Sequence, residues 1–455
     1  MILGIQSNGT LGKVGVITHH LFLRSQPKKI MKATVLLVAL AMIAPSLRAD
    51  AVLDWNAIAM QTILGGGRPG PTAMIDCAVV HAAIHDAVQA FDKTYQAYAT
   101  EMTATSGSPA AAVAKAARDV LVNRFPAQTA AVDTAYANYL AANGIAANDA
   151  GIEIGAAAAA GMIAARANDG TFPATQPIFI GSSEPGMWRP TPSLLPGAPP
   201  SFAPMAVVWL ADSKPFVALS GDQFGATAPY SLKNGLYSRE YNEVKTLGSL
   251  NSTTRTPEQT DLAYFYADNF VALAHRMIRG IVENEIDSSA DRARLLALVW
   301  LTAADGLISA WTSKLQYPTW RPITGIREGD ADGNQHTVGD PNWQPLINTP
   351  NYPDQCSGAN TLMGGVTEML KQFFGTDNVT FKVTSNHPNA TVKERTYTRF
   401  SDVSLDVVEV RIYQGIHFRT ADLDGRRCGR SVARYVFANA LVPLSGEASE
   451  VATQD

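Results

Sequence analysis

The positions of proline and glycine, the two residues that interrupt helices, constrain this chain most. Residues 73–91 are rich in apolar side chains and contain neither, and residues 149–167 are dominated by alanine, the strongest helix former. Ser108 stands where a helix N-cap is expected, and Asn143-Gly144 is a typical helix stop. These features predict a bundle of helices in the first part of the chain.

Prolines cluster in the middle of the chain and predict a change of structure there. They fall at positions 190, 192, 196, 199, 200 and 204. Such a segment does not continue a helix and is expected to run over the surface, as a connection or as a lid over a substrate entrance.

Helical signals return in the second half of the chain. Thr256, Pro257 and Gln259 have the spacing of a capping box and predict a helix that runs to about Asn284. No alternating pattern predicts a sheet, so the expected fold is all-α. Further helices are predicted over residues 289–314, 358–375, 401–413 and 424–441.

Composition supports a large core and excludes two classes of partner. Apolar residues make up 46% of the 455 residues and charged residues 17%, which argues against disorder. The formal net charge of −4 gives no reason to expect nucleic acid or an anionic membrane surface as a partner. Cys77, Cys356 and Cys428 allow one disulfide in an oxidising compartment, but the sequence does not choose the pair.

The N-terminus has the pattern of a secretory signal peptide. An apolar run at residues 33–45 follows Lys28, Lys29 and Lys32, and small residues follow at 49–51. The run is short for a membrane span, and we expect no second span in the chain. The mature protein is therefore expected in the periplasm or outside the cell, without a membrane partner. An uncleaved N-terminal anchor is the alternative.

Three segments of the second half carry residues suited to chemistry. In the first, a lysine ends a predicted helix and an arginine follows seven residues later, before a proline. The second is a serine-glycine turn that enters a helix, and in the third an arginine and a histidine stand on either side of a glycine break. The residues concerned are Lys314, Arg321, Ser357, Gly358, Arg411 and His417.

A tetrahedral oxyanion such as phosphate or vanadate is bound by groups of these kinds. Arginine offers a planar fork of N–H groups, and lysine offers a point charge. A helix N-terminus adds free amides and a dipole that favours anions. An imidazole nitrogen is able to attack phosphorus or to bind vanadium. Each part alone is more often ordinary: a pair of solvated cations, a helix cap or a structural histidine.

The order and spacing of these residues resemble a family signature. Lys-x6-Arg-Pro, then Ser-Gly at a helix start, then Arg-x5-His is similar to the active-site pattern of vanadium-dependent haloperoxidases and type 2 phosphatidic acid phosphatases. The resemblance covers about residues 52–441. Segments outside the motifs look like the bacterial haloperoxidase-like branch: Asp54-Trp55-Asn56 and residues 82–88, 255–260 and 415–419.

The resemblance implies an all-α fold of two packed helical bundles with a long proline-rich loop segment between them. The expected domains are an upstream extension plus signal peptide at 1–51, an N-terminal bundle at 52–175, a proline-rich connecting or lid segment at 176–255, a C-terminal bundle with the active site at 256–445, and a disordered tail at 446–455.

The resemblance also implies roles for the site residues. The three cations would neutralise the equatorial oxygens of a bound vanadate, and Ser357 and the Gly358 amide would hydrogen-bond one of them. His417 would be the axial vanadium ligand. The implied reaction uses peroxide to oxidise halide or another small nucleophile, including an organic acceptor. An acid phosphatase that acts on a phosphoester through a phosphohistidine is the alternative. Large helical surfaces make a homodimer reasonable.

The sequence departs from the family where protons are handled. The family's Pro-Ser-Gly-His reads Cys-Ser-Gly-Ala here, so alanine at Ala359 replaces the general acid/base histidine. The acidic residue expected four positions after the axial histidine is Ala421, with Asp422 one place late. A third alternative is therefore a homologue that binds an oxyanion but turns over poorly. His387 and His336 are the candidates for a replacement acid/base.

The sequence also contains a possible zinc site, separate from the oxyanion site. His81 and His85 stand four residues apart on a predicted helix, with Asp76 and Asp86 nearby, and this spacing is able to bind zinc. The segment is also apolar enough to be core, and a buried histidine with satisfied hydrogen bonds is the commoner outcome.

Overall fold

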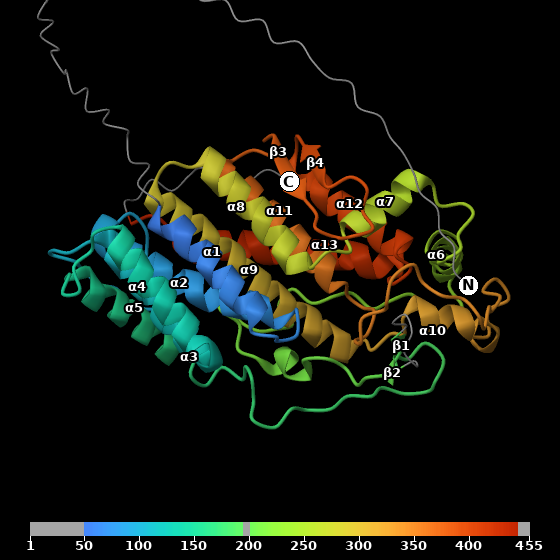
Figure 1. The fold of residues 1–455 in the computed structure, drawn as a ribbon. Coiled ribbons are helices and arrows are strands. Elements are labelled where there is room, and N and C mark those ends of the chain that lie inside the picture. The colour runs from blue at the N-terminus through green and yellow to red at the C-terminus, as the bar shows by residue number, and fades with distance from the viewer. Residues whose placement is uncertain (1–49, 194–200, 445–455) are drawn as a thin grey trace, which may run out of the picture. The chain divides into compact units, whose positions relative to one another are not determined.

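The computed structural model describes residues 50–193 and 201–444, and this part of the chain is mostly helical, as predicted (Figure 1). The α-helices are α1 Ala51–Gly65, α2 Thr72–Asp92, α3 Pro109–Arg124, α4 Thr129–Ala142, α5 Gly151–Ala165, α6 Gly235–Leu247, α7 Pro257–Phe265, α8 Phe270–Glu285, α9 Ser289–Gln316, α10 Pro322–Arg327, α11 Gly358–Phe374, α12 Phe400–Tyr413 and α13 Arg419–Asn439. The short 3-10 helices are η1 Pro126–Gln128, η2 Val208–Asp212 and η3 Gly329–Ala331, and the strands are β1 Pro192–Ser193, β2 Ser201–Phe202, β3 Phe381–Thr384 and β4 Glu394–Tyr397.

Helix α9 forms the centre of the fold (Figure 1). It packs against α2 from the N-terminal part and against α11 and α13 from the C-terminal part. Nearly all of its side chains from Ala290 to Trp311 are buried, and its last turn carries Lys314. This largely buried central helix therefore places a cation at its C-terminal end, where the helix dipole favours positive charge.

Helix α9 is also long and apolar enough to cross a membrane, which corrects the expectation that no second segment has that character. In this structure, 94% of its most apolar window is buried inside the protein. A core helix passes the same test of length and hydropathy, so the burial explains the composition without a membrane.

The N-terminal helices follow the local signals of the sequence. Ser108 caps α3 because its side chain accepts a hydrogen bond from the amide of Ala111. Helix α4 ends at Ala142, and Gly144 has a left-handed backbone with φ of +62°. The predicted start and stop signals are therefore correct to within a residue or two.

One long helix expected from Thr256 to about Asn284 is two helices, α7 and α8. The Asn269 side chain accepts a hydrogen bond from the amide of Ala272 and starts α8 afresh. Asp268 beside it forms an ion pair with Arg276. Because asparagine and aspartate side chains compete for backbone amides, they favour a new N-cap over a continued helix.

The capping box at the start of α7 is present as predicted. Thr256 accepts a hydrogen bond from the Gln259 amide, and the Gln259 side chain accepts one from the Thr256 amide. Two backbone donors that the helix itself cannot satisfy are thereby paired.

Regular structure also occurs where none was expected. Helix α6 lies within the segment predicted as a proline-rich connection, and Asn234 caps it. The pairs β1–β2 and β3–β4 form two small antiparallel hairpins. Strands of two to four residues are too short to produce a recognisable alternating pattern, which is why the sequence did not indicate them.

Parts of the predicted domain division fall outside the described residues. The proposed signal peptide and upstream extension, residues 194–200 of the connecting segment and the C-terminal tail are among them. The boundaries at residues 175 and 255 stay predictions. Within the described residues, α2 and α9 pack directly on each other although they were assigned to different bundles.

Helices α11 and α13 approach each other closely through two glycines. A Cβ atom added at Gly425 would lie 2.4 Å from the Ser357 carbonyl oxygen, and one at Gly429 would lie 2.0 Å from that of Thr361. In addition, the Ser357 amide donates a 2.9 Å hydrogen bond to the Ala421 carbonyl. The N-terminus of α11 is therefore fixed against α13.

We expect Gly429→Ala to destabilise the protein by about 1–3 kcal/mol or more, because the methyl group would overlap backbone atoms that have no room to move. Gly280→Ala in α8 is the matched control. Its Cβ would meet nothing within 4 Å, and alanine should stabilise the helix by about 0.5–1 kcal/mol. Urea unfolding of the two variants and the parent chain measures both effects. Equal stability of the two variants would contradict the close packing of α11 on α13.

Candidate active site

The four charged or titratable residues singled out in the sequence come from the ends of helices. Lys314 lies in the last turn of α9, and Arg321 is the N-cap of α10. Arg411 lies in the last turn of α12, and His417 follows in the connection to α13. All four side chains are buried, and the positive charges of the three cations act on the His417 imidazole. The structure thus brings together residues separated by about a hundred positions.

The Lys314 ammonium group is held by backbone carbonyl oxygens. Its Nζ donates hydrogen bonds to the carbonyls of Pro353 at 2.8 Å and Cys356 at 2.6 Å, with Asp354 at 3.4 Å. Burial lowers the pKa of Lys314 to about 7, and the charge of Arg321 adds to that effect. Lys314 therefore holds the loop before α11 against the end of α9. Burial of its charged form lowers the stability of the folded protein.

Arg321 joins the same loop to the histidine. Its Nε donates to the Tyr352 carbonyl at 2.7 Å, and one terminal nitrogen donates to the Ile416 carbonyl at 2.6 Å. That nitrogen also lies 3.0 Å from His417 Nε2. Burial lowers the pKa of His417 well below its usual value, and Arg321, Arg411 and Lys314 lower it further. The imidazole is therefore neutral at pH 7 and keeps a nitrogen lone pair.

Arg411 leaves part of its hydrogen-bonding capacity unused. One terminal nitrogen donates to Gln414 Oε1 at 2.8 Å, and Gln414 is itself fixed by donating to the Ala263 carbonyl at 2.7 Å. The Nε of Arg411 and the second terminal nitrogen of Arg321 are buried without a hydrogen-bond partner. Two unpaired guanidinium donors in one buried cluster are unusual, because such groups are normally satisfied. They are suited to an anion.

The Ser-Gly turn lies at the N-terminus of α11, as predicted. Ser357 is the N-cap residue, but no side chain caps the amides of the first turn, which begins at Gly358. The Ser357 hydroxyl instead accepts a 3.3 Å hydrogen bond from the Asn360 side chain. The helix N-terminus therefore keeps uncapped amides beside the cation cluster, a combination that favours anions.

Two buried carboxylates belong to this cluster, and the sequence analysis did not assign them to it. Asp354 Oδ1 lies 2.8 Å from His417 Nδ1 and 3.6 Å from Arg321, and its Oδ2 accepts the Phe418 amide at 3.3 Å. The 2.8 Å approach to His417 is a close pair without hydrogen-bond geometry. Burial raises the pKa of Asp354 to about 7, against the opposing charges of Arg321 and Lys314.

Asp422 is the acidic residue that seemed one position late. Its Oδ1 accepts a 2.8 Å hydrogen bond from Asn360, while Oδ2 is buried without a partner. Burial raises its pKa well above the usual value, although the nearby Arg411 charge opposes the shift. Because Asp422 lies in the first turn of α13, its side chain reaches the cluster despite the offset in sequence. Asp354 lies two residues before Cys356 of the Cys-Ser-Gly motif, and no motif in the sequence marks it as a site residue.

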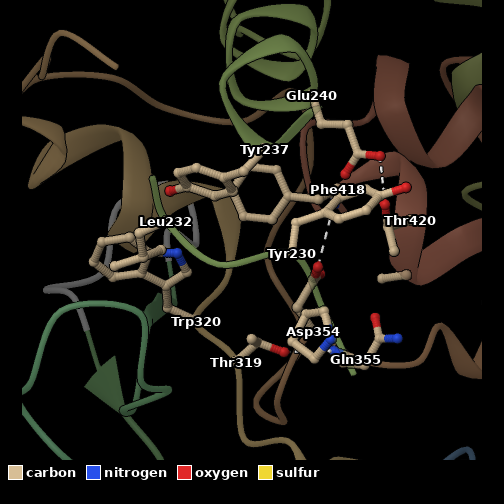
Figure 2. A pocket seen from close by; sticks show the side chains of 12 residues that line it. Tyr230, Leu232, Tyr237, Glu240, Thr319, Trp320, Asp354, Gln355, Phe418 and Thr420 are labelled. Atoms are coloured by element: carbon tan, nitrogen blue, oxygen red, sulfur yellow. Dashed lines mark hydrogen bonds between the residues drawn. The ribbon is translucent and has the colours of Figure 1, made fainter. Parts of the chain in front are cut away.

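A pocket opens beside the cluster, and Asp354 lies in its wall (Figure 2). It is small, with a cavity volume of about 30 Å³ for water-sized molecules. Tyr237 and Phe418 face each other across one side, with ring centres 5.7 Å apart. Figure 2 shows Asp354 bonded to the Phe418 backbone, next to Gln355. The pocket therefore offers a small molecule an aromatic surface and a route to the carboxylate that contacts His417.

Comparison with known proteins agrees with this geometry. The family model described as the VCPO second helical-bundle domain matches residues 294–446, which include all of the predicted site residues. Vanadium chloroperoxidase from Curvularia inaequalis is 28% identical over 190 residues, which are 34% of this chain and 30% of that protein. Residues 294–446 of this chain are therefore similar in sequence to a domain of the vanadium haloperoxidase family. The sequence match spans less than a third of the fungal protein's length.

Solved structures of the vanadium haloperoxidase family share the fold. A bacterial vanadium-dependent iodoperoxidase has a TM-score of 0.73 at 21% identity, and the match covers 88% of this chain and 97% of that chain. The apo form of a bacterial vanadium-dependent chloroperoxidase has a TM-score of 0.66 at 16% identity, covering 81% and 92%. At these identities the likeness describes the fold and not the reaction.

Neither histidine considered as a substitute for the missing acid/base contacts the candidate site. His387 stacks on Tyr264 with ring centres 5.5 Å apart, and its charged neighbours are Asp268 and Lys393. His336 is exposed, and its carbonyl accepts a hydrogen bond from Asn242. The titratable groups that contact the cluster are the two carboxylates instead.

The competing metal site is not formed among the described residues. His81 Nδ1 bonds the Cys77 carbonyl at 2.8 Å, and its Nε2 lies 2.8 Å from the Asn56 side chain, which also bonds His275. His85 bonds the Gln96 carbonyl at 3.0 Å. No group of three metal-ligating side chains occurs in the part of the chain that the structure describes. Burial lowers the pKa of His81 to about 4, as expected of a core histidine.

The lowered pKa of Lys314 predicts how stability depends on pH. An unfolded lysine titrates near 10.4, so between pH 7 and pH 10 the unfolded chain binds more protons than the folded protein. The free energy of unfolding should therefore rise through this range, by about 1.4 kcal/mol for each unit of pKa shift.

Lys314→Met should abolish that rise, and Lys382→Met on an exposed strand residue should retain it. Urea unfolding at several pH values, in buffer free of phosphate and vanadate, measures the difference. If stability changes with pH in the same way in the parent chain and in Lys314→Met, the pKa of Lys314 is not lowered in the folded protein.

Proposed function

We propose that this protein is a vanadate-dependent haloperoxidase-like enzyme that uses peroxide to oxidise a halide or another small nucleophile. One observation carries the proposal: three buried cations surround a neutral histidine, and two of their N–H donors have no partner. The relatives named chloroperoxidase and iodoperoxidase support the same reaction class. Their halides differ, so the halide used by this chain is left open.

The residues present fit vanadate on chemical grounds. The unpaired nitrogens of Arg321 and Arg411 and the uncapped amides at Gly358 are donors that a tetrahedral oxyanion accepts from. We propose that they hold its oxygens together with Lys314 and Ser357, and that His417 binds the metal through Nε2. Bound vanadate would supply a Lewis-acidic centre at which peroxide is activated toward nucleophiles.

The chain's own residues would prepare and stabilise that chemistry. Desolvation and the surrounding cations keep His417 unprotonated, so its lone pair stays available at neutral and mildly acidic pH. Arg321 and Arg411 are fixed by backbone and Gln414 contacts, so little reorganisation is needed when negative charge develops on an oxygen. The apolar pocket beside Asp354 would admit peroxide and the nucleophile.

Proton transfer is the step for which this chain differs from its family. Ala359 carries no proton, and no histidine other than His417 contacts the cluster among the described residues. We propose that Asp354 takes this role, because its pKa of about 7 allows it to hold a proton at neutral pH and release it readily. Its place between the pocket and His417 suits such an exchange.

Two alternatives share the same pocket. A phosphatase would use His417 as the nucleophile toward phosphorus, with the cations stabilising the transferred group. Ala359 favours the other alternative, a homologue that binds the oxyanion with little turnover. Purified protein loaded with vanadate, assayed for halide oxidation and, without vanadate, for aryl phosphate hydrolysis, separates the three. Hydrolysis that vanadate blocks would contradict the peroxidase proposal.

Arg411→Gln should weaken vanadate binding by about 10- to 100-fold, because a buried charge-assisted donor is lost. Arg434→Gln is the matched control, since Arg434 is more than half exposed and pairs with Glu368 at a distance from the site residues. Isothermal titration with orthovanadate measures both affinities. Unchanged binding by Arg411→Gln would place the anion elsewhere.

Ala359→His should raise the rate of halide oxidation by vanadate-loaded protein, by up to about 10²–10⁴-fold, because it restores a general acid/base at the start of α11. Ala359→Gln is the control, with similar size and hydrogen bonding but no titration near pH 7. Initial rates with peroxide and bromide measure the effect. An equal gain from glutamine would exclude proton transfer as the cause.

Location and partners are further parts of the proposal. The signal-like N-terminus supports export to the periplasm or the cell exterior. Peroxide, halide and an organic acceptor are the proposed small-molecule substrates. A homodimer is proposed on the basis of the large helical surfaces alone.

A further inference from the structure

Two of the three cysteines lie together beside the proposed oxyanion site. Cys356 directly precedes α11, and Cys428 lies in the middle of α13. The close approach of these helices at Gly425 and Gly429 brackets Cys428 and brings it to the start of α11. Both sulfur-bearing side chains are fully buried.

The surroundings make the two thiols unequal. Cys428 donates a weak hydrogen bond to the Ser309 hydroxyl at 3.5 Å, and Cys356 lies 3.8 Å from the Thr361 hydroxyl. The neighbouring Cys428 side chain lowers the pKa of Cys356, and the positive charge of Lys314 lowers it further although burial opposes this. The pKa of Cys428 is raised well above its usual value. Such a difference is typical of a nucleophilic and a resolving thiol.

A small pocket lies next to the pair along the chain, and neither cysteine is among its lining residues. Asp354 and Gln355, the two residues before Cys356, line it (Figure 2). Cys356 also stands where the family signature has proline, so the thiol is a feature of this chain that the proposed peroxidase reaction does not use.

We propose that Cys356 and Cys428 form a second, vanadium-independent peroxide-reactive site, with Cys356 as the attacking thiol and Cys428 as the resolving thiol. The Cys356 sulfur attacks one oxygen of hydrogen peroxide. The O–O bond breaks, hydroxide leaves and takes up the Cys356 proton as water, and the sulfur is oxidised to sulfenic acid. The Cys428 sulfur then attacks this sulfur. An S–S bond forms as the S–O bond breaks, and the Cys428 proton leaves with the hydroxyl group as a second water.

The product is a disulfide that links the start of α11 to α13. One peroxide molecule and two thiols yield one disulfide and two water molecules, and a thiol reductant such as dithiothreitol would return the pair to the thiol state. Because Cys356 is held by the same lysine as the loop of the oxyanion site, the disulfide would form directly beside Ser357. The pair would therefore reduce excess peroxide to water next to the proposed oxyanion site. The resulting disulfide would mark the protein as oxidised.

The test uses the full chain without vanadate, so its outcome does not depend on the haloperoxidase proposal. The protein is reduced with dithiothreitol, desalted, treated with hydrogen peroxide for increasing times, then denatured in alkylating reagent and mapped by mass spectrometry. Cys77 is the internal control, because it is equally buried and the structure shows no sulfur partner for it within the described residues. Burial raises its pKa well above the usual value.

We expect a peptide linked through Cys356 and Cys428 to appear while Cys77 remains fully alkylated. In Cys428→Ser, Cys356 should instead accumulate as a sulfenic acid that dimedone traps, and Cys77→Ser should behave as the parent chain. Absence of the linked peptide, or loss of all three thiols at the same rate, would overturn the proposal. So would a Cys428→Ser variant in which dimedone labels no Cys356.

Discussion

Three buried cations packed around one imidazole are the arrangement on which this site depends. Removing a charge from water is costly, and like charges in one buried cluster raise that cost. Backbone carbonyls partly compensate Lys314 and Arg321, and the Asp354 and Asp422 side chains lie close to the cations. Compensation is incomplete, since guanidinium nitrogens and carboxylate oxygens both remain unpaired. A site of this kind is suited to binding an anion. Apolar side chains at the same positions would make the folded protein more stable than these buried charges do.

The ends of helices α9, α10 and α12 position the three cations of this site. Lys314 is fixed by the central helix α9, and Arg411 by the last turn of α12. Gly415, with φ of +77°, turns the chain so that His417 enters the cluster. Close glycine contacts fix α13 against the first turn of α11. The positions of the functional groups are thus set by core packing, which suits preorganised binding of charge.

The sequence predicted most of the helices because their signals are local: caps and glycine stops. The six site residues were chosen from motif spacing, and their roles stay predictions. The sequence missed the break before α8, where Asn269 starts a new helix, and it gave no account of helix α6. It also could not assign Asp354, because nothing in the spacing shows that this carboxylate folds back onto His417. Such contacts depend on the path of a loop, which local propensity does not determine.

The most direct test of the central claim is a crystal structure of the protein soaked in orthovanadate, with vanadium located by its anomalous scattering. The account predicts one strong peak within bonding distance of His417 Nε2, with oxygens that accept hydrogen bonds from Lys314, Arg321 and Arg411. A peak elsewhere, or an unchanged cluster with no vanadium at saturating vanadate, would contradict it.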